Sequence, residues 1–483
     1  MLLKGIYTVD KYTKIQLILT LFFAAFYANI SIVNHLNFRT NWFDLGFYTH
    51  HIYDYAHFNF AHLKTNLSDH FDLFLIIISP LQYLFGQYTL LIVQILFMLI
   101  GSYGVFLYSN AILKDKHKSL ILQLTFLLCF AVISSIAFDY HSNVIAACLI
   151  PFLLYYYKTE KKWKFILLWL MIIFTKENVM FNTSVLVTLL PFFHKESKLK
   201  RISFAIGIIG LIMFWLIVSK VMPAFSNTAV YFNFRYTNVG NSKSFSEMFV
   251  FIITHPFETL KLLFINTRNN PLFDHYKTEA HIFIFLSGGF LLLRKPVLLL
   301  MSIPLYLQKF LHDSQNVWGL SFQYNIDFVP IIFMAIISFL EKDYKWQLNK
   351  NLVYIFLFLN IILTIRMMDN TVSFVKKSSL RIYQGMHYTS EINKNTYKEL
   401  SKLIPEKSSV CAQSFFTPHF SLRDSIFQFD EHDHKTEYII VADSTQPYPL
   451  TAIQFQERID TLLKDTAYRL IADKDNIKLF KRN

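Results

Sequence analysis

Residues 41–71 read NWFDLGFYTHHIYDYAHFNFAHLKTNLSDHF and lie between two strongly apolar segments. A connection between two membrane helices needs only a few polar residues, whereas this one is long, aromatic and rich in titratable groups. That composition predicts a surface at the membrane interface, with Tyr, Trp and His at headgroup level. We expect it to form one wall of an active site facing away from the cytoplasm. Its titratable residues are Asp44, Asp54, Asp69, His50, His51, His57, His62 and His70.

The composition around this loop is that of a membrane protein. Of the 483 residues, 54% are hydrophobic and only 16% are charged, and soluble domains rarely combine the two. The net charge of +13 does not indicate a nucleic-acid partner, because Lys and Arg stand in short runs between apolar segments, where they set topology. The three cysteines exclude a disulfide framework, and Cys129, Cys148 and Cys411 are predicted to be ordinary core residues.

Hydropathy predicts about eleven membrane-crossing helices, with lengths near 20 residues and shorter ones tolerated. The first is longer than the apolar core of a signal peptide, so we expect it to stay uncleaved. A further apolar stretch, 73–85, is short and contains Pro80, and it is predicted to be re-entrant or interfacial. The predicted spans are Ile15–Val33, Tyr88–Asn110, Ser119–Ala137, Val144–Tyr157, Phe165–Phe174, Val179–Phe193, Ile202–Val221, His281–Leu293, Pro296–Leu311, Asn325–Leu340 and Leu352–Ile365.

Basic residues mark alternate connections between these spans. The positive-inside rule places those connections in the cytoplasm, with the N-terminus, in a cytoplasmic (inner) membrane. The loop around Asp44, the turns at Asp139 and Lys176, the segment 312–324 and the tail after Ile365 then face outward. The basic groups are Lys4, Lys11 and Lys14; Lys114, Lys116 and Lys118; Lys158, Lys161, Lys162 and Lys164; Lys195, Lys198, Lys200 and Arg201; Arg294 and Lys295; and Lys342, Lys345 and Lys350.

The chain divides into two predicted parts. Residues 1–368 form the membrane domain, with outer loops at 34–71 and 222–278, and residues 369–483 form a small extracytoplasmic α/β domain. In the second loop, Phe249–Ile265 is predicted to be an amphipathic helix lying on the membrane. Helix and strand patterns in the tail predict helices at Ser390–Leu403 and Phe455–Leu463, strands at Ser409–Gln413 and Tyr438–Asp443, and a hairpin over Tyr468–Lys481 that turns near Lys474–Asn476.

Two tight turns carry polar groups at the ends of apolar helices. One holds Asp139 and His141 in FDYHSN, and the other holds Lys176 and Glu177 in FTKEN. Ionisable groups near membrane depth are costly and tend to be functional, so these turns and Asp44 predict a shared cavity. The structural alternative is that Lys176 and Glu177 only cap their helices and pair with each other.

The histidines of the first loop do not match a strong zinc spacing, and we expect no histidine metal site. A divalent cation held by carboxylates and substrate phosphate stays an alternative, because such sites need only one or two carboxylates.

Several ordered motifs carry a resemblance that covers nearly the whole chain. They are FDLG (43–46), HF (70–71) before an apolar run with Pro80, FDYHSN (138–143), TKEN (175–178), FQYNIDFVP (322–330) and SVCAQSFFTPHFSLR (409–423). This set resembles the family of predicted membrane proteins catalogued as domain of unknown function 2079. That family is itself similar to C-type (GT-C) membrane glycosyltransferases, which use lipid-phosphate sugar donors and carry an acid in the first outer loop.

The resemblance implies a GT-C-like fold and a transferase that takes a sugar from a polyprenyl-phosphate donor at the outer membrane face. Asp44 corresponds to the first-loop acid and would be the catalytic base, although the paired acid of many such enzymes is absent, since Leu45 and Gly46 follow it. The implied substrate-binding residues are Lys176, Glu177, Asp139, His141, His70, Arg235, Arg268, Gln413, His419 and Arg423, with Lys309 as a further cation.

Other functions remain open. A transporter or lipid flippase would need polar residues near the bilayer midplane and two related halves. A non-catalytic membrane protein would use its outer domain, including Gln413, His419 and Arg423, to bind a partner. Asp44 itself would only cap a helix that begins near Leu45, and Arg235 and Arg268 would only bind lipid headgroups.

Overall fold

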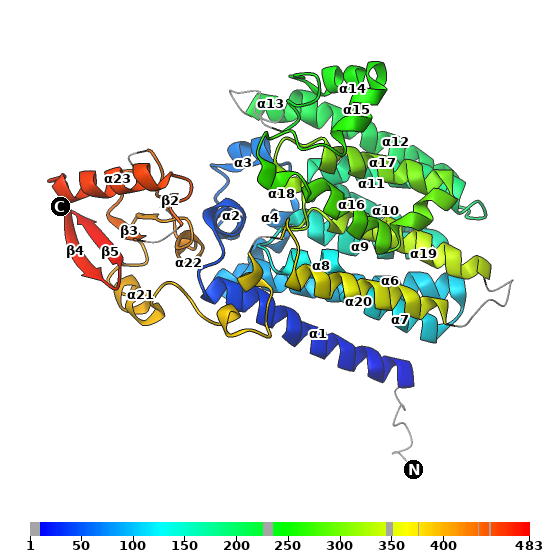
Figure 1. Ribbon diagram of the computed structural model, residues 1–483, viewed down its shortest axis with the longest axis horizontal. Coiled ribbons are helices and arrows are strands. Elements are labelled where there is room, and N and C mark those ends of the chain that lie inside the picture. The colour runs from blue at the N-terminus through cyan, green and yellow to red at the C-terminus, as the bar shows by residue number, and fades with distance from the viewer. Residues whose placement is uncertain (1–9, 226–234, 344–350, 375, 433, 444–445) are drawn as a thin grey trace, which may run out of the picture.

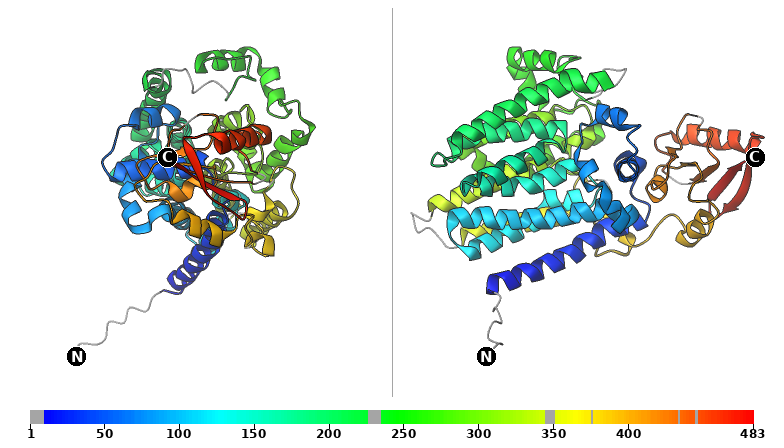
Figure 2. Two further views of the ribbon diagram at one scale, coloured as in Figure 1. Left: turned by 90° about the vertical axis from the view of Figure 1, so that its left-hand side faces the viewer. Right: turned by 180° about the vertical axis from the view of Figure 1, so that it is seen from behind.

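The computed structural model describes residues 10–225, 235–343, 351–374, 376–432, 434–443 and 446–483. Most of the long helices run roughly parallel through one body, and a small sheet domain stands beyond one end of that body (Figure 1). The described N-terminal helix starts near the opposite end, and the view from behind shows the same arrangement (Figure 2). The chain is therefore a helical bundle with a mixed α/β domain at one end.

The helical part comprises the elements α1 to α20. Their bounds are α1 Lys11–Leu36, η1 Trp42–Gly46, α2 Phe47–Ala56, α3 Leu63–Asp69, α4 Phe74–Ile78, α5 Gln82–Phe85, α6 Thr89–Leu113, α7 Lys116–Leu127, α8 Phe130–Ile136, α9 Ser142–Lys158, α10 Lys162–Ile173, α11 Glu177–Phe193, α12 Lys200–Leu216, α13 Met222–Phe225, α14 Phe245–Thr254, α15 Pro256–Leu262, α16 Tyr276–Leu286, α17 Pro296–Phe310, α18 Gln315–Trp318, α19 Val329–Asp343 and α20 Leu352–Asp369.

Within the described ranges, four helical stretches are long and apolar enough to cross a membrane. They are Lys11–Leu36, Phe74–Leu113, Lys200–Phe225 and Leu352–Asp369, and the pair α7 and α8, bent by 44°, raises the number to five. The predicted count of about eleven is not supported. The other six predicted spans correspond to helices of 17 residues or fewer, such as α9 and α10.

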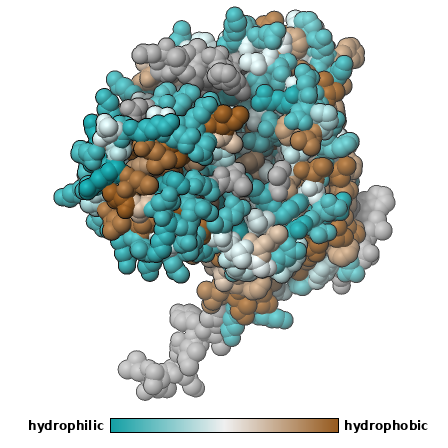
Figure 3. Space-filling model, turned by 60° about the vertical axis from the view of Figure 1, so that its left-hand side comes forward, coloured by the Kyte–Doolittle hydropathy of each residue, from teal (hydrophilic) through white to brown (hydrophobic). Residues whose placement is uncertain are grey.

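The excess in that prediction has a physical cause. Hydropathy registers an apolar segment whether it faces lipid or the interior of a bundle. Almost every residue of α9 is buried against neighbouring helices. On α1, by contrast, Leu17, Ile18, Leu21 and Phe22 are each 60–65% exposed, as in a helix that contacts lipid. A hydrophobic patch beside the grey N-terminal residues shows this surface (Figure 3).

The connections with basic residues lie together. Glu160, between α9 and α10, forms a 3.8 Å ion pair with Lys198, between α11 and α12. The ammonium of Lys295 lies 4.4 Å from the ring centroid of Phe193 at the end of α11. The described basic loops therefore share the end of the bundle opposite the sheet domain (Figure 1). The predicted basic residues Lys4, Lys345 and Lys350 and the side chain of Lys342 lie outside the described residues.

Two predicted helices are broken. The stretch 73–85 is divided into α4, a single turn at Ser79–Leu81 and α5, as expected of a short segment with Pro80. The predicted helix Phe249–Ile265 is two helices, α14 and α15, which separate at His255 because Pro256 cannot continue the backbone ladder of α14.

The C-terminal part is a five-stranded sheet with strand order β2-β1-β3-β5-β4. Strands β2, β1 and β3 are parallel, and β5 and β4 are antiparallel to their neighbours. The predicted strands, the C-terminal helix and the hairpin are confirmed, whereas α22 and β2 had no clear sequence pattern. The elements are α21 Lys394–Ser401, β1 Val410–Ala412, α22 Thr417–Phe420, β2 Ile426–Gln428, β3 Tyr438–Ala442, α23 Ala452–Lys464, β4 Tyr468–Lys474 and β5 Ile477–Arg482.

The first outer loop and the sheet domain pack directly against each other. Phe38, which follows α1, is 5% exposed and belongs to the hydrophobic core on one face of the sheet. Its ring lies 5.4 Å from that of Phe416 and 4.8 Å from that of His419. The backbone N–H of Trp42 donates to the Ser414 hydroxyl at 3.3 Å, so the domain holds the start of η1 in place.

Candidate functional site

Three predicted polar segments meet at the domain-bearing end of the bundle: η1 with Asp44, the α8–α9 turn with Asp139 and His141, and the α10–α11 turn with Lys176 and Glu177. The carboxylate of Asp44 lies 2.9 Å from Nε2 of His141. The carboxylate of Asp139 accepts a hydrogen bond from the backbone N–H of Asn41 at 3.2 Å. These two contacts hold the first loop, residues 34–71, against the α8–α9 turn.

Asp44 occupies an unusual backbone position. Its φ is +81° and its ψ is −94°, in a region that L-residues rarely adopt. The N-cap of α2 is Gly46, and no side chain caps that helix, so helix capping does not account for Asp44. Burial would favour the neutral acid, but the charges of His141, Lys176 and His70, with the hydrogen bond from His141, lower the pKa of Asp44.

The surroundings of Asp139 shift its pKa in the opposite direction to that of Asp44. Burial, and then the negative charge of Asp44, raise the pKa of Asp139 well above its usual value. The surroundings thus push the pKa values of the two neighbouring carboxyl groups apart, lowering that of Asp44 and raising that of Asp139. Two acids whose environments push their pKa values apart are a typical arrangement for acid–base chemistry.

Gln94, near the start of α6, orients the turn that carries Asp139 and His141. Its side-chain carbonyl accepts the backbone N–H of His141 at 2.9 Å, and its amide donates to the backbone carbonyls of Ser135 and Asp139, both at 3.2 Å. Gln94 is fully buried, so nothing from solvent can replace these bonds.

The residues of the α10–α11 turn do not pair with each other. Glu177 binds the ring of His70 at 3.0 Å and the backbone N–H of Phe71 at 2.9 Å. Burial opposes its ionisation, but the positive charge of His70, its hydrogen bond and the charge of Lys176 lower the pKa of Glu177. Among the residues that the structure describes, the ammonium of Lys176 has neither a hydrogen bond nor an ion pair within 4.0 Å.

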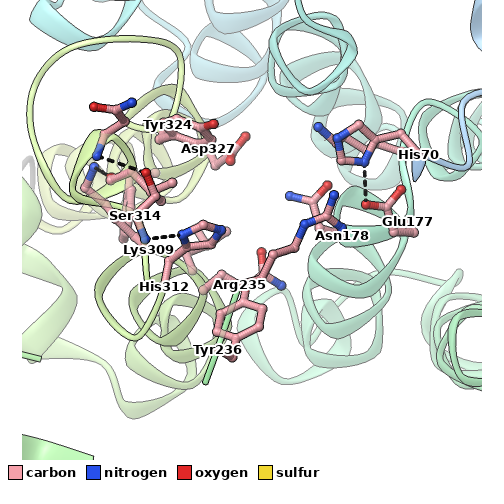
Figure 4. Close-up of a pocket in the computed structure, with 16 residues that line it drawn as sticks. His70, Glu177, Asn178, Arg235, Tyr236, Lys309, His312, Ser314, Tyr324 and Asp327 are labelled. Atoms are coloured by element: carbon pink, nitrogen blue, oxygen red, sulfur yellow. Dashed lines mark hydrogen bonds and ion pairs between the residues drawn. The ribbon is translucent and has the colours of Figure 1, made fainter. Parts of the chain in front are cut away.

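Lys176, Glu177 and His70 line a cavity of about 450 Å³. One wall carries His70, Glu177 and Asn178; the facing wall carries Lys309, His312, Ser314, Tyr324 and Asp327; and Arg235 lies between them (Figure 4). Asp44 is not among the lining residues, but it acts on one of them: burial and then the charge of Asp44 raise the pKa of Tyr324. The cavity is thus rich in cations and adjoins the ionised Asp44.

The other predicted cations, Arg235, Lys309 and Arg268, each have contacts of their own. One terminal nitrogen of Arg235 lies 3.1 Å from the carboxylate of Asp69 in the first outer loop. Lys309 donates to the backbone carbonyls of Val317 and Gly319 at 2.7 and 2.9 Å. Arg268 bonds to Gln315 at 3.3 Å and is not among the residues that line the cavity.

The three predicted site residues of the sheet domain lie away from the cavity. The side chain of Gln413 accepts the N–H of Ala442 at 2.7 Å and donates to the carbonyl of Gln446 at 3.0 Å. The His419 ring stacks on His35 with centroids 4.1 Å apart. Arg423 donates to the carbonyls of Phe420 and Ser408. Gln413 and Arg423 are buried and His419 is half-buried, and all three hold the domain's own loops or its contact with α1.

Sequence reasoning missed Gln94, Asp72, His312, Tyr324 and Asp327. Asp327 stands inside an apolar run within FQYNIDFVP, and a lone acid in such a run is a signal that was available. It accepts a hydrogen bond from Asn143 at 3.2 Å, which joins this segment to the α8–α9 turn. Gln94 carries no such signal, because single amides are common in apolar helices.

Within the described ranges, no group of three or more His, Cys, Asp or Glu side chains is arranged to hold a metal ion. The two acids of the cavity, Glu177 and Asp327, stand on opposite walls, and each already accepts a hydrogen bond (Figure 4). Among the described residues, the acids of the cavity are therefore not gathered around one point where the protein alone could hold a divalent cation.

Residues 34–479 match the family described as predicted membrane protein (DUF2079). The chain belongs to this family. The match begins near the end of α1 and reaches β5, so the DUF2079 region includes both the cavity and the sheet domain. The family and the long apolar helices together indicate a membrane protein. No curated protein matches the chain.

Proposed function

We propose that this DUF2079 protein is a membrane glycosyltransferase that moves a sugar from a polyprenyl-phosphate donor to an acceptor outside the cytoplasm. One observation carries the proposal: the unpaired ammonium of Lys176, among the described residues, lines a cation-rich cavity beside the ionised carboxylate of Asp44. A positive site next to a base suits a substrate that loses a phosphate while a hydroxyl gives up its proton.

The cavity suits the phosphate of the donor. Lys176 is free to approach a phosphate oxygen, Arg235 contributes positive charge from between the two walls, and Lys309 is a further cation on the facing wall. These charges stabilise the negative charge that develops on the leaving phosphate. The apolar helices around this end of the bundle would accommodate the polyprenyl chain, and membrane lipids are the natural surroundings of such a donor.

Asp44 is the proposed base. The acceptor oxygen forms a bond to the anomeric carbon, while the bond from that carbon to the phosphate oxygen breaks and the lipid phosphate leaves with both electrons. The acceptor's proton passes to the Asp44 carboxylate. His141 orients that carboxylate through its 2.9 Å contact, and the raised pKa of Asp139, caused by burial and then by the charge of Asp44, favours a division of roles in which Asp44 is the base.

We infer that the site faces away from the cytoplasm of an inner membrane. The basic connections lie together at the far end of the bundle, which suits the cytoplasmic side under the positive-inside rule. In this arrangement the sheet domain is extracytoplasmic. The GT-C-like count of about eleven crossings would require short helices such as α9, α10 and α11 to span a locally thinned bilayer beside the longer ones.

The proposal is tested first by ligand binding. Full-length protein in detergent is heated with a long-chain polyprenyl phosphate or with the uncharged polyprenol of equal length. We expect only the phosphate to raise the melting temperature. Lys176→Ala should abolish that rise, and Lys176→Arg should keep part of it, because arginine retains the charge but changes the geometry.

Lys116→Ala is the matched control, because Lys116 is exposed, pairs with Asp10 and lies at the opposite end of the bundle. It should leave the rise unchanged. Equal stabilisation by polyprenol and polyprenyl phosphate, or a full response in Lys176→Ala, would overturn the proposal. Those results would favour a transporter or a non-catalytic partner-binding protein instead.

A further inference from the structure

A second cavity, of about 490 Å³, lies where the sheet domain meets the helical bundle. Its walls come from the end of α1, from the strap 376–392 that leads into the sheet domain, and from two loops of that domain. We propose that this cavity binds a polyhydroxylated, carbohydrate-like ligand. Its role as the acceptor site rests on the proposed function, whereas binding itself does not.

Arg39 fixes the shape of the cavity. Its guanidinium donates to the backbone carbonyls of Ser378, Met386, His387 and Thr389, at 2.7 to 3.1 Å. Four carbonyls from one segment, bound by one side chain, hold the strap against the bundle. Because its terminal nitrogens serve these carbonyls, Arg39 does not offer the bidentate face that phosphate recognition uses. The second cavity therefore differs in kind from the cation-rich first one.

The chemistry of the walls suits a neutral polyol. Hydroxyl groups come from Ser378, Thr389 and Ser390, and two phenylalanine rings, Phe38 and Phe415, form apolar walls. Charged residues of both signs, including Lys376 and Glu391, also contribute to the lining, so the cavity favours no single ionic class. Alternating polar groups and aromatic rings match the hydroxyls and C–H faces of a sugar.

Asn37 supplies an independent sign of a ligand. It lines the cavity, is only 4% exposed, and donates its amide to the carbonyl of His387 at 2.9 Å. Its buried carbonyl oxygen has no hydrogen-bond partner among the described residues. A buried acceptor without a donor is costly, so Asn37 leaves this side of the cavity with a polar group that the described residues do not satisfy.

The second cavity also lies close to the acids of the first site. Lys376 on its wall acts electrostatically on Asp139, and Asn37 and Arg39 precede the Asn41 N–H that Asp139 binds. On the other flank, the ring of Tyr448 lies 5.9 Å from that of Phe43, next to Asp44. Asp139 and Asp44 are thus each linked to residues in or beside the wall of the second cavity, which suits an acceptor bound there.

The experiment is saturation-transfer NMR on the full-length protein with lactose, maltose and sucrose as probes and inorganic phosphate as the ionic probe. Lipid nanodiscs replace maltoside detergents, which themselves carry sugar. At least one disaccharide should receive saturation from the wild-type protein. Thr389→Trp fills the cavity from an exposed strap position and should reduce that signal several-fold, since Arg39 binds only the backbone of Thr389.

Thr466→Trp is the matched control on an exposed turn of the same domain and should keep the signal. Lys176→Ala should also keep it, which separates this inference from the proposed function. The inference is wrong if no disaccharide receives saturation, if Thr389→Trp leaves the signal intact, or if phosphate competes with the sugars. A thermal melt of each variant verifies that a lost signal is not lost folding.

Discussion

Nε2 of His141 lies 2.9 Å from the carboxylate of Asp44, although the two residues are 97 positions apart in the chain. The contact joins the first loop to the α8–α9 turn, and it is among the causes that lower the pKa of Asp44, whereas burial and the charge of Asp44 raise that of Asp139. One side-chain contact therefore connects the packing of the loop to the acidity of the carboxyl group on which the proposed chemistry depends.

Asp44→Asn should lower sugar transfer by ~10²-fold or more, because the amide keeps the shape of the side chain and removes the base. Asn tolerates a positive φ better than most residues, so the backbone at φ +81° should survive. The measurement is transfer by membrane extracts at matched protein abundance. Full activity in the Asn variant would remove Asp44 from the mechanism.

Gln94→Leu should lower both the melting temperature and the transfer activity. The change leaves the buried N–H of His141 without its acceptor, at a cost of roughly 1–3 kcal/mol, and it removes one hydrogen bond each from the carbonyls of Ser135 and Asp139. Gln123→Leu is the matched control, since Gln123 is a buried amide that bonds Ser102 and Gln16 rather than the site. The Gln123→Leu variant should lower the melting temperature but keep the transfer activity per folded molecule. Equal losses of activity in both variants would contradict a positioning role for Gln94.

Asp72 should make stability depend on pH. Burial raises its pKa to about 7, above the ~3.9 of an unfolded chain, so the folded state binds more protons between those values. Stability should therefore fall as pH rises from about 4 to about 7. Asp72→Asn should flatten that part of a melting-temperature profile, while Asn can still cap α4 as Asp72 does through Phe74 and Leu75. An unchanged slope in the variant would contradict this assignment.

Gly101→Ala should destabilise the bundle markedly. A Cβ at Gly101 would lie 2.8 Å from the Cβ and 2.9 Å from the Cα of Cys148, so α6 and α9 would have to separate. Overpacking of this kind costs roughly 1–3 kcal/mol or more. Gly385→Ala meets nothing within 4 Å and should be neutral in the same thermal melt. A neutral Gly101→Ala would show that the two helices pack more loosely than described.

The sequence predicted those parts of the fold that depend on local pattern. A continuous β-prone run marked β3, local helix and hairpin patterns marked α23 and the β4–β5 hairpin, and Pro80 marked the break between α4 and α5. The number of spans could not be predicted, because an apolar helix such as α9 looks the same whether lipid or protein surrounds it. Strand β2 has three residues and follows irregular chain, so no period was long enough to detect it.

The site was predictable only in part, for a related reason. Charged residues in tight turns of an apolar chain stand out, and Asp44, Asp139, His141, Lys176 and Glu177 were found in that way. Their partners depend on which turns meet in space, and a sequence does not give that. Glu177 binds His70 rather than its neighbour Lys176, and Gln413, His419 and Arg423 support the sheet domain rather than the cavity.

The burial of Phe38 among sheet-domain residues has a mechanical consequence. The side chain that completes the domain's core is attached to the end of the first membrane helix, only six positions before Asp44. The sheet domain and α1 cannot tilt relative to each other without moving the short segment between Phe38 and Asp44. A protein, glycan or drug that binds the sheet domain would therefore change the position of the Asp44 carboxylate. A chain that ends after α20 would lose the contacts that keep η1 in its unusual conformation.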